Sequence, residues 1–129
     1  MSIEMKMLVW SIALGLVQIA LAATFATAQR GIKWNAGPRD GMAPPLNPVA
    51  GRLDRASRNF LETFAFFAAA VLAVMLMQKA DAQTALGAQL YFWARLAYLP
   101  LYAAGVPYLR TLVWAVSLVG LLMVLSGLF

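Results

Sequence analysis

The chain has 129 residues, of which 63% are hydrophobic and 12% charged, and its mean hydropathy is +0.76. Soluble domains carry roughly twice that share of charged residues, so the composition indicates an integral membrane protein. The absence of cysteine and histidine excludes disulfides, thiol chemistry by the protein itself and imidazole-based haem or zinc sites, and no metal site is expected. The net charge is +5, and the basic residues lie mainly beside apolar segments. Membrane topology and contact with anionic lipid explain this placement, so a nucleic-acid-binding protein is not indicated.

Four apolar segments are long enough to cross a bilayer, and we expect helices at about residues 5–28, 49–78, 84–104 and 108–128. Residues 30–50 are rich in glycine, proline and charge, which predicts a loop. The short connection between the second and third helices implies antiparallel neighbours. The predicted fold is therefore all-α, a single integral membrane four-helix bundle over residues 1–129.

The basic residues are divided unequally between the two sides of this bundle. Lys6 and Lys79 lie on the side of the termini. Seven lie on the opposite side: Arg30, Lys33, Arg39, Arg52, Arg55, Arg58 and Arg110. Because cytoplasmic segments carry the excess of lysine and arginine, we expect both termini on the non-cytoplasmic side.

The second predicted helix begins with a dense polar run. Arg55, Asn59 and Glu62 are spaced i, i+4 and i+7, so they share one helical face. Only 16 uncharged residues follow, at 63–78, so Glu62 lies at or inside the hydrocarbon boundary. An ionisable group at that depth is costly and marks a candidate functional site.

The third predicted helix carries a stripe of polar side chains at helical spacing: Tyr91, Arg95, Tyr98 and Tyr102. Arg95 falls near mid-membrane, so the stripe is expected to face protein or a polar cavity. We expect Arg95 and Glu62 to share a polar interior, and replacement of Glu62 to destabilise the chain more than replacement of Glu4 or Asp81.

At the cytoplasmic face, the helix ends can bring six polar residues together: Arg55, Asn59, Glu62, Tyr98, Tyr102 and Arg110. Guanidinium groups, an amide, phenols and one carboxylate suit a small zwitterionic acid. The alternative interpretation is that Glu62 neutralises Arg95 or Arg58 and that the tyrosines are interface anchors. A small ion or drug transporter is less well supported, because no acidic residue lies deep in the other helices.

Three motifs make a family resemblance specific. Residues 55–62 read Arg-Ala-Ser-Arg-Asn-Phe-Leu-Glu, residues 94–98 read Ala-Arg-Leu-Ala-Tyr, and residues 107–111 read Pro-Tyr-Leu-Arg-Thr, with Tyr102 between the last two. Together they resemble the MAPEG family, the membrane-associated proteins in eicosanoid and glutathione metabolism. The resemblance implies a homotrimer of four-helix subunits that binds glutathione between neighbouring subunits near the cytosolic face.

By position, the resemblance implies that glutathione, as co-substrate, contacts five residues: Arg55, Asn59, Glu62, Arg95 and Tyr98. Arg110 matches the arginine that stabilises the thiolate, and Tyr102 is the second catalytic candidate. The implied function is transfer of glutathione to lipophilic electrophiles, or reduction of hydroperoxides with it, in a bacterial inner membrane. The alternative is a non-catalytic membrane subunit or lipid-binding module of the same fold.

Overall fold

The computed structural model describes residues 1–129 and contains five helices and no strand. They are α1 (Ile3–Arg30), α2 (Ile32–Ala36), α3 (Pro48–Leu76), α4 (Ala82–Ala103) and α5 (Pro107–Ser126). The four long helices begin and end within two residues of the predicted limits.

Local sequence explains where these helices begin. The side chains of Ser2 and Asn47 cap α1 and α3 by accepting hydrogen bonds from backbone N–H groups of the first turn. Asp81 forms a reciprocal capping box with Thr84 at the start of α4. Pro107 is the first residue of α5, where its missing N–H costs nothing.

The prediction of an unbroken loop at residues 30–50 is wrong, because this segment contains the short helix α2. Gly31, at φ +89°, breaks the chain after α1 and allows it to turn into α2. The side-chain amide of Asn35 then donates to Thr27 Oγ1 at 2.8 Å, which holds α2 against the end of α1. Composition alone did not reveal this tertiary contact.

Three helices, α1, α3 and α5, are long and apolar enough to cross a membrane, which fits an integral membrane protein. The 22-residue α4 is long enough but less apolar, since it carries polar side chains such as Gln83, Gln89 and Arg95. Its crossing of the bilayer therefore remains a prediction.

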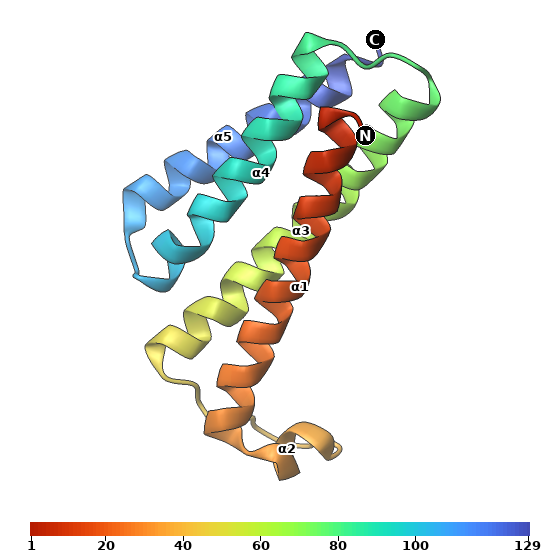
Figure 1. The fold of residues 1–129 in the computed structure, drawn as a ribbon. Coiled ribbons are helices and arrows are strands. Elements are labelled where there is room, and N and C mark those ends of the chain that lie inside the picture. The colour runs from red at the N-terminus through yellow and green to blue at the C-terminus, as the bar shows by residue number, and fades with distance from the viewer.

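The helices form two pairs, α1 with α3 and α4 with α5, that meet near the termini and diverge toward the other end (Figure 1). Both termini and the α3–α4 connection lie at one end, whereas α2 and the α4–α5 turn lie toward the other. The seven basic residues counted above thus gather away from the termini, as predicted. Which end faces the cytoplasm stays a prediction.

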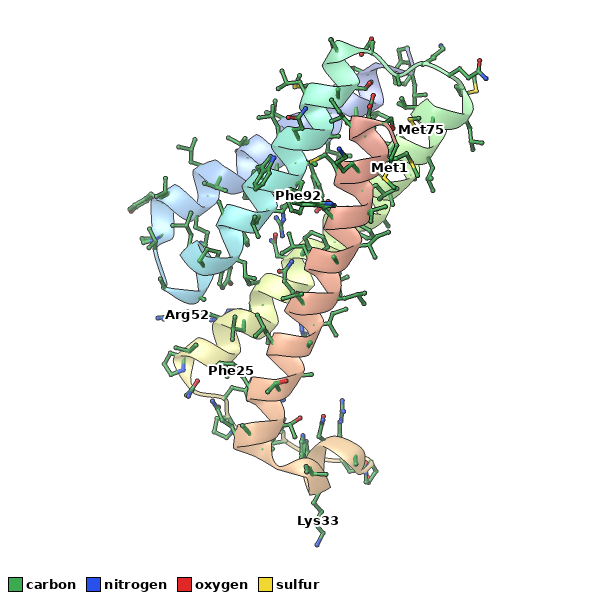
Figure 2. All side chains as sticks on the ribbon, in the orientation of Figure 1. Met1, Phe25, Lys33, Arg52, Met75 and Phe92 are labelled. Atoms are coloured by element: carbon green, nitrogen blue, oxygen red, sulfur yellow. The ribbon has the colours of Figure 1, made fainter.

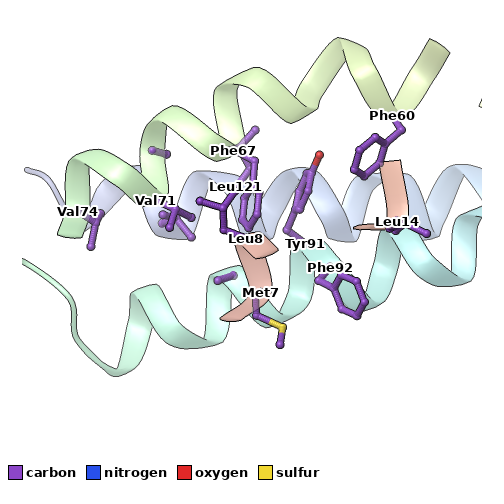
Figure 3. Packing of buried hydrophobic residues seen from close by; sticks show 13 residues of the cluster. Met7, Leu8, Leu14, Phe60, Phe67, Val71, Val74, Tyr91, Phe92 and Leu121 are labelled. Carbon is purple, nitrogen blue, oxygen red and sulfur yellow. The ribbon is translucent and has the colours of Figure 1, made fainter. Parts of the chain in front are cut away.

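Stacked aromatic rings join α3 to α4 (Figure 3). The rings of Phe67 and Tyr91 are 4.0 Å apart with an interplanar angle of 14°. The Tyr91 hydroxyl lies 3.0 Å from the hydroxyl of the half-buried Thr63, which gives the buried phenol a hydrogen-bond partner. Tyr91, Arg95 and Tyr98 are all buried, which confirms that their stripe faces protein.

Between α4 and α5 the backbones touch at two glycines. A Cβ atom on Gly87 would lie 2.6 Å from the carbonyl oxygen of Gly120, and one on Gly120 would lie 2.5 Å from that of Gly87. Small residues allow this approach, which is a common way for helices to associate in lipid.

The carboxylate buried in the single chain is Glu4, not Glu62. Glu4 is 3% exposed, and the Thr84 hydroxyl donates to its Oε2 at 2.6 Å. Burial in the single chain therefore favours a larger loss of stability on replacement of Glu4 than of Glu62, the reverse of the order expected from the sequence. Its partner lies 80 residues away, so sequence spacing carried no signal of the contact.

Candidate functional site

A cavity of about 320 Å³ lies between α3, α4 and α5, toward the end away from the termini. Its lining residues are Asn59, Tyr98, Tyr102, Arg110, Thr111 and Trp114. Four of these were predicted site residues from three different helices. The fold thus brings together side chains that are up to 51 positions apart in the sequence.

Arg95 is not part of the cavity lining but contacts two residues of it, and only 1% of its surface is exposed. Its Nη1 donates to Asn59 Oδ1 at 2.8 Å, and its guanidinium carbon lies 4.5 Å from the centre of the Tyr98 ring. Its Nε and Nη2 have no hydrogen-bond partner in the chain. A buried cation normally has an anionic partner, and the chain places no carboxylate within ion-pair distance of Arg95. Arg95 therefore favours the binding of an anion in this region.

Tyr102 lies between two arginines from different helices. Arg55 Nε donates to the Tyr102 hydroxyl at 3.1 Å, and the Arg110 guanidinium lies 4.6 Å from the centre of the Tyr102 ring. Cation–π contact of this kind is attractive because the ring face is electron-rich. Tyr102 therefore ties the start of α3 to the start of α5 at the edge of the cavity.

Glu62 differs from the other predicted site residues. It is exposed in the single chain and does not line the cavity, so the prediction of an interior position is wrong for the chain by itself. It also pairs with neither Arg95 nor Arg58, because the one ion pair in the chain joins Arg58 Nε to Asp54 Oδ2 at 3.2 Å. In the single chain Glu62 therefore forms no ion pair with either arginine.

Sequence reasoning missed two cavity residues, Thr111 and Trp114. Trp114 stands four positions after Arg110 and therefore on the same face of α5. That spacing could have identified it. Thr111 follows Arg110 directly and carried no periodic signal.

The arrangement favours a small anionic or zwitterionic ligand. Arg110 lines the cavity, and the guanidinium groups of Arg55 and Arg95 donate to its lining residues Tyr102 and Asn59. No carboxylate lines the cavity. Fixed cations of this kind bind carboxylates and stabilise a thiolate relative to its thiol.

The family model described as the MAPEG family matches residues 7–129, which include part or all of every helix. Neither the curated proteins nor the solved structures contain a significant match to the chain. The family includes glutathione transferases and peroxidases. With nearly its whole length matched, this membrane-helical chain belongs to the MAPEG family.

Proposed function

We propose that this protein binds glutathione at the arginine–tyrosine cavity and transfers it to lipophilic electrophiles or uses it to reduce hydroperoxides. The observation that carries the proposal is the buried Arg95, which has two unpartnered N–H groups and contacts Asn59 and Tyr98 of the cavity lining. Membership of a family that includes both activities supports it.

Glutathione carries two carboxylates, one ammonium group and one thiol, and the predicted residues complement each of them. Arg55 and Arg95 supply guanidinium donors for the carboxylates, with Asn59 and Tyr98 as neutral partners. Glu62 is the acid available for the ammonium group. A cavity of about 320 Å³ is at the small end of ligand sites, which suits a ligand as small as a tripeptide.

Arg110 and Tyr102 are the proposed catalytic residues. A free thiol has a pKa of about 8.5 and is mostly protonated at neutral pH. A guanidinium beside the sulfur favours the thiolate, and a phenol can donate a hydrogen bond to it. The thiolate then attacks an electrophilic carbon, forming a C–S bond as the leaving group departs with its electron pair.

With a hydroperoxide the same thiolate attacks the terminal oxygen and breaks the O–O bond. The alkoxide takes up a proton to become an alcohol, and the sulfenic form of glutathione reacts with a second glutathione to give the disulfide and water. A lipophilic acceptor is expected because the chain lies in a membrane, so the acceptor can enter from the bilayer.

The proposal includes a homotrimer in a bacterial inner membrane. The exposed position of Glu62 on α3 fits a face that a neighbouring subunit covers, which would bring its carboxylate to glutathione bound between subunits. Light scattering of purified protein tests this assembly, and a monomer would contradict it.

Sidedness is testable with single cysteines in this cysteine-free chain. Cysteines at Ser2 and Ala82 are expected to react with an impermeant reagent from outside, whereas one at Gly41 is expected to be protected in intact spheroplasts. Labelling of Gly41→Cys from outside would reverse the proposed topology.

The decisive experiment separates glutathione binding from thiolate formation. Arg110→Ala is expected to keep most glutathione affinity while losing the ultraviolet absorbance of the thiolate. Glu62→Gln and Arg55→Ala are expected to lose affinity itself, with Arg58→Ala as the matched control because the Arg58 guanidinium is paired with Asp54.

Tyr102→Phe tests whether the phenol, rather than the guanidinium, stabilises the sulfur. Loss of the thiolate in Tyr102→Phe with Arg110→Ala unaffected would reverse the two roles. Wild-type protein that neither binds glutathione nor forms the thiolate would contradict the proposal and favour the non-catalytic membrane subunit.

A further inference from the structure

The two proposed catalytic residues lie on opposite sides of one tight turn. Tyr102 is in the last turn of α4, Arg110 is in α5, and Gly105 lies between them at φ +76°. The distance between the phenol and the guanidinium therefore depends on the conformation of this turn. The cation–π contact of Arg110 with Tyr102 spans it.

Arg52, near the start of α3, contacts this turn directly (Figure 2). Its Nη1 donates to the carbonyl oxygen of Ala103 at 3.4 Å. A Cβ atom on Gly105 would lie 2.9 Å from Arg52 Cζ and 3.0 Å from its Nη2. The positive φ of Gly105 favours glycine, and a side chain there would displace the Arg52 guanidinium from the turn.

Electrostatics favours this contact. The last carbonyl groups of a helix have no intrahelical partner and form its negative end, where a cation is stabilising. Arg52 is half-buried and has no acidic partner within ion-pair distance, since the one ion pair of the chain joins Arg58 and Asp54. Its interaction is therefore with the turn.

Three residues further along α3, Arg55 donates to the Tyr102 hydroxyl. Positions three apart lie on the same side of a helix, so the first turns of α3 hold the end of α4 at two points. Arg55 contacts the catalytic phenol itself, whereas Arg52 contacts only backbone beyond it.

We propose that Arg52 is a positioning residue of the site: by holding the α4–α5 turn through Ala103 and Gly105, it places Tyr102 and Arg110 against the same ligand sulfur. This inference rests on the proposed glutathione chemistry. Arg52 bonds the backbone of the turn and no side chain assigned to glutathione, so its removal changes the alignment of the catalytic pair rather than the groups that bind the carboxylates.

The first test measures glutathione affinity and thiolate reactivity in the same variants of the full chain. Arg52→Ala is expected to keep an affinity close to wild type while the reaction of bound glutathione with a small aryl electrophile slows by about 10- to 100-fold, the effect of misalignment of about 1 Å. Arg52→Lys is expected to recover most of the rate, because it keeps a cationic donor at the end of α4. Arg58→Ala is the matched control and is expected to react normally.

The second test uses the glycine side of the contact and remains informative if Arg52→Ala folds poorly. Gly105→Ala is compared with Gly31→Ala and Gly41→Ala, which also have positive φ but no atom within 4 Å of the new Cβ. All three carry the backbone strain, but only Gly105→Ala is expected to lose the thiolate absorbance. In an Arg52→Ala background, adding Gly105→Ala is expected to have little further effect on that absorbance.

The outcomes separate the two proposals. If wild-type protein forms the thiolate and both Arg52→Ala and Gly105→Ala form it equally well, the positioning role is overturned and the proposed function stands. Equal loss of glutathione affinity and reactivity in Arg52→Ala would also overturn it, because Arg52 would then be a binding residue. Absence of glutathione binding in the wild type would overturn the proposed function and the positioning role with it.

Discussion

The end of the molecule near the termini and the end at the α4–α5 turn are held together by different interactions. Near the termini, stacked rings such as Phe67 on Tyr91 and the touching backbones at Gly87 and Gly120 leave little room between helices. At the other end, arginines contact phenol rings and carbonyl oxygens, and a cavity remains.

This difference separates stability from ligand chemistry along the length of the helices. Tight packing near the termini can supply the free energy that fixes four long helices relative to one another. The opposite end can then keep a buried cation, Arg95, that has two unpartnered N–H groups. These N–H groups do not contribute to packing. Mutations at the two ends are therefore expected to fail in different ways.

The largest effect on stability is expected from Phe67→Ala. Phe67 is fully buried against Tyr91, so the loss of its ring should cost about 3–5 kcal/mol. The neighbouring Phe66 is 68% exposed, and Phe66→Ala is the matched control with little expected loss. Thermal unfolding in detergent measures both. Equal melting temperatures would show that the ring stack is not the source of stability.

The two acidic residues, Glu4 and Glu62, provide a direct comparison between the ends. Glu4→Leu removes the acceptor of the buried Thr84 hydroxyl and should cost about 1–3 kcal/mol, the range for a buried polar group that loses its partner. Glu62→Leu should reduce stability less but abolish glutathione affinity. A larger loss of melting temperature in Glu62→Leu than in Glu4→Leu would mean that the burial pattern of the single chain does not govern stability.

Gly120→Ala tests the backbone contact between α4 and α5. The added methyl group would lie 2.5 Å from the Gly87 carbonyl oxygen, so the helices must separate, at a cost of about 1–3 kcal/mol for overpacking. Gly51→Ala, also within a helix, meets only the flexible end of Arg55 and should be neutral or slightly stabilising. If both variants melt alike, the close approach contributes nothing.

The smallest effect is expected for Arg58→Ala, which breaks the exposed ion pair with Asp54. The two side chains are 75% and 38% exposed, so the pair is screened by solvent and is worth at most about 1 kcal/mol. The difference from wild type should shrink further in high salt. A salt-independent loss of stability would indicate a contact other than the ion pair.

Much of the fold could be predicted from the sequence because the signals are local. Apolar segments with capping residues such as Asp81 and a leading Pro107 set the helix limits to within two residues. The short helix α2 was missed because five residues carry no periodicity and its support comes from Thr27.

The candidate site was predictable only where helical register and membrane topology constrain it. These place Asn59, Tyr98, Tyr102 and Arg110 at one depth, and the structure groups them around one cavity. Which face of a helix points toward the neighbouring helices depends on tertiary packing, which the spacing of residues along one helix does not determine. For this reason Glu62 was expected inside but lies exposed.

The hydrogen bond from Arg55 to Tyr102 also has a polarity that limits what the phenol can do. A guanidinium group has no acceptor atom, so the phenol oxygen must receive this bond, and its own hydrogen must point elsewhere. No other protein group takes that hydrogen, and Tyr102 lines the cavity. With a cation on its oxygen and a second over its ring, Tyr102 is far better suited to give a hydrogen bond than to receive another. At this position the cavity therefore favours ligand atoms that accept a hydrogen bond from the phenol and disfavours ammonium groups, which can only donate one.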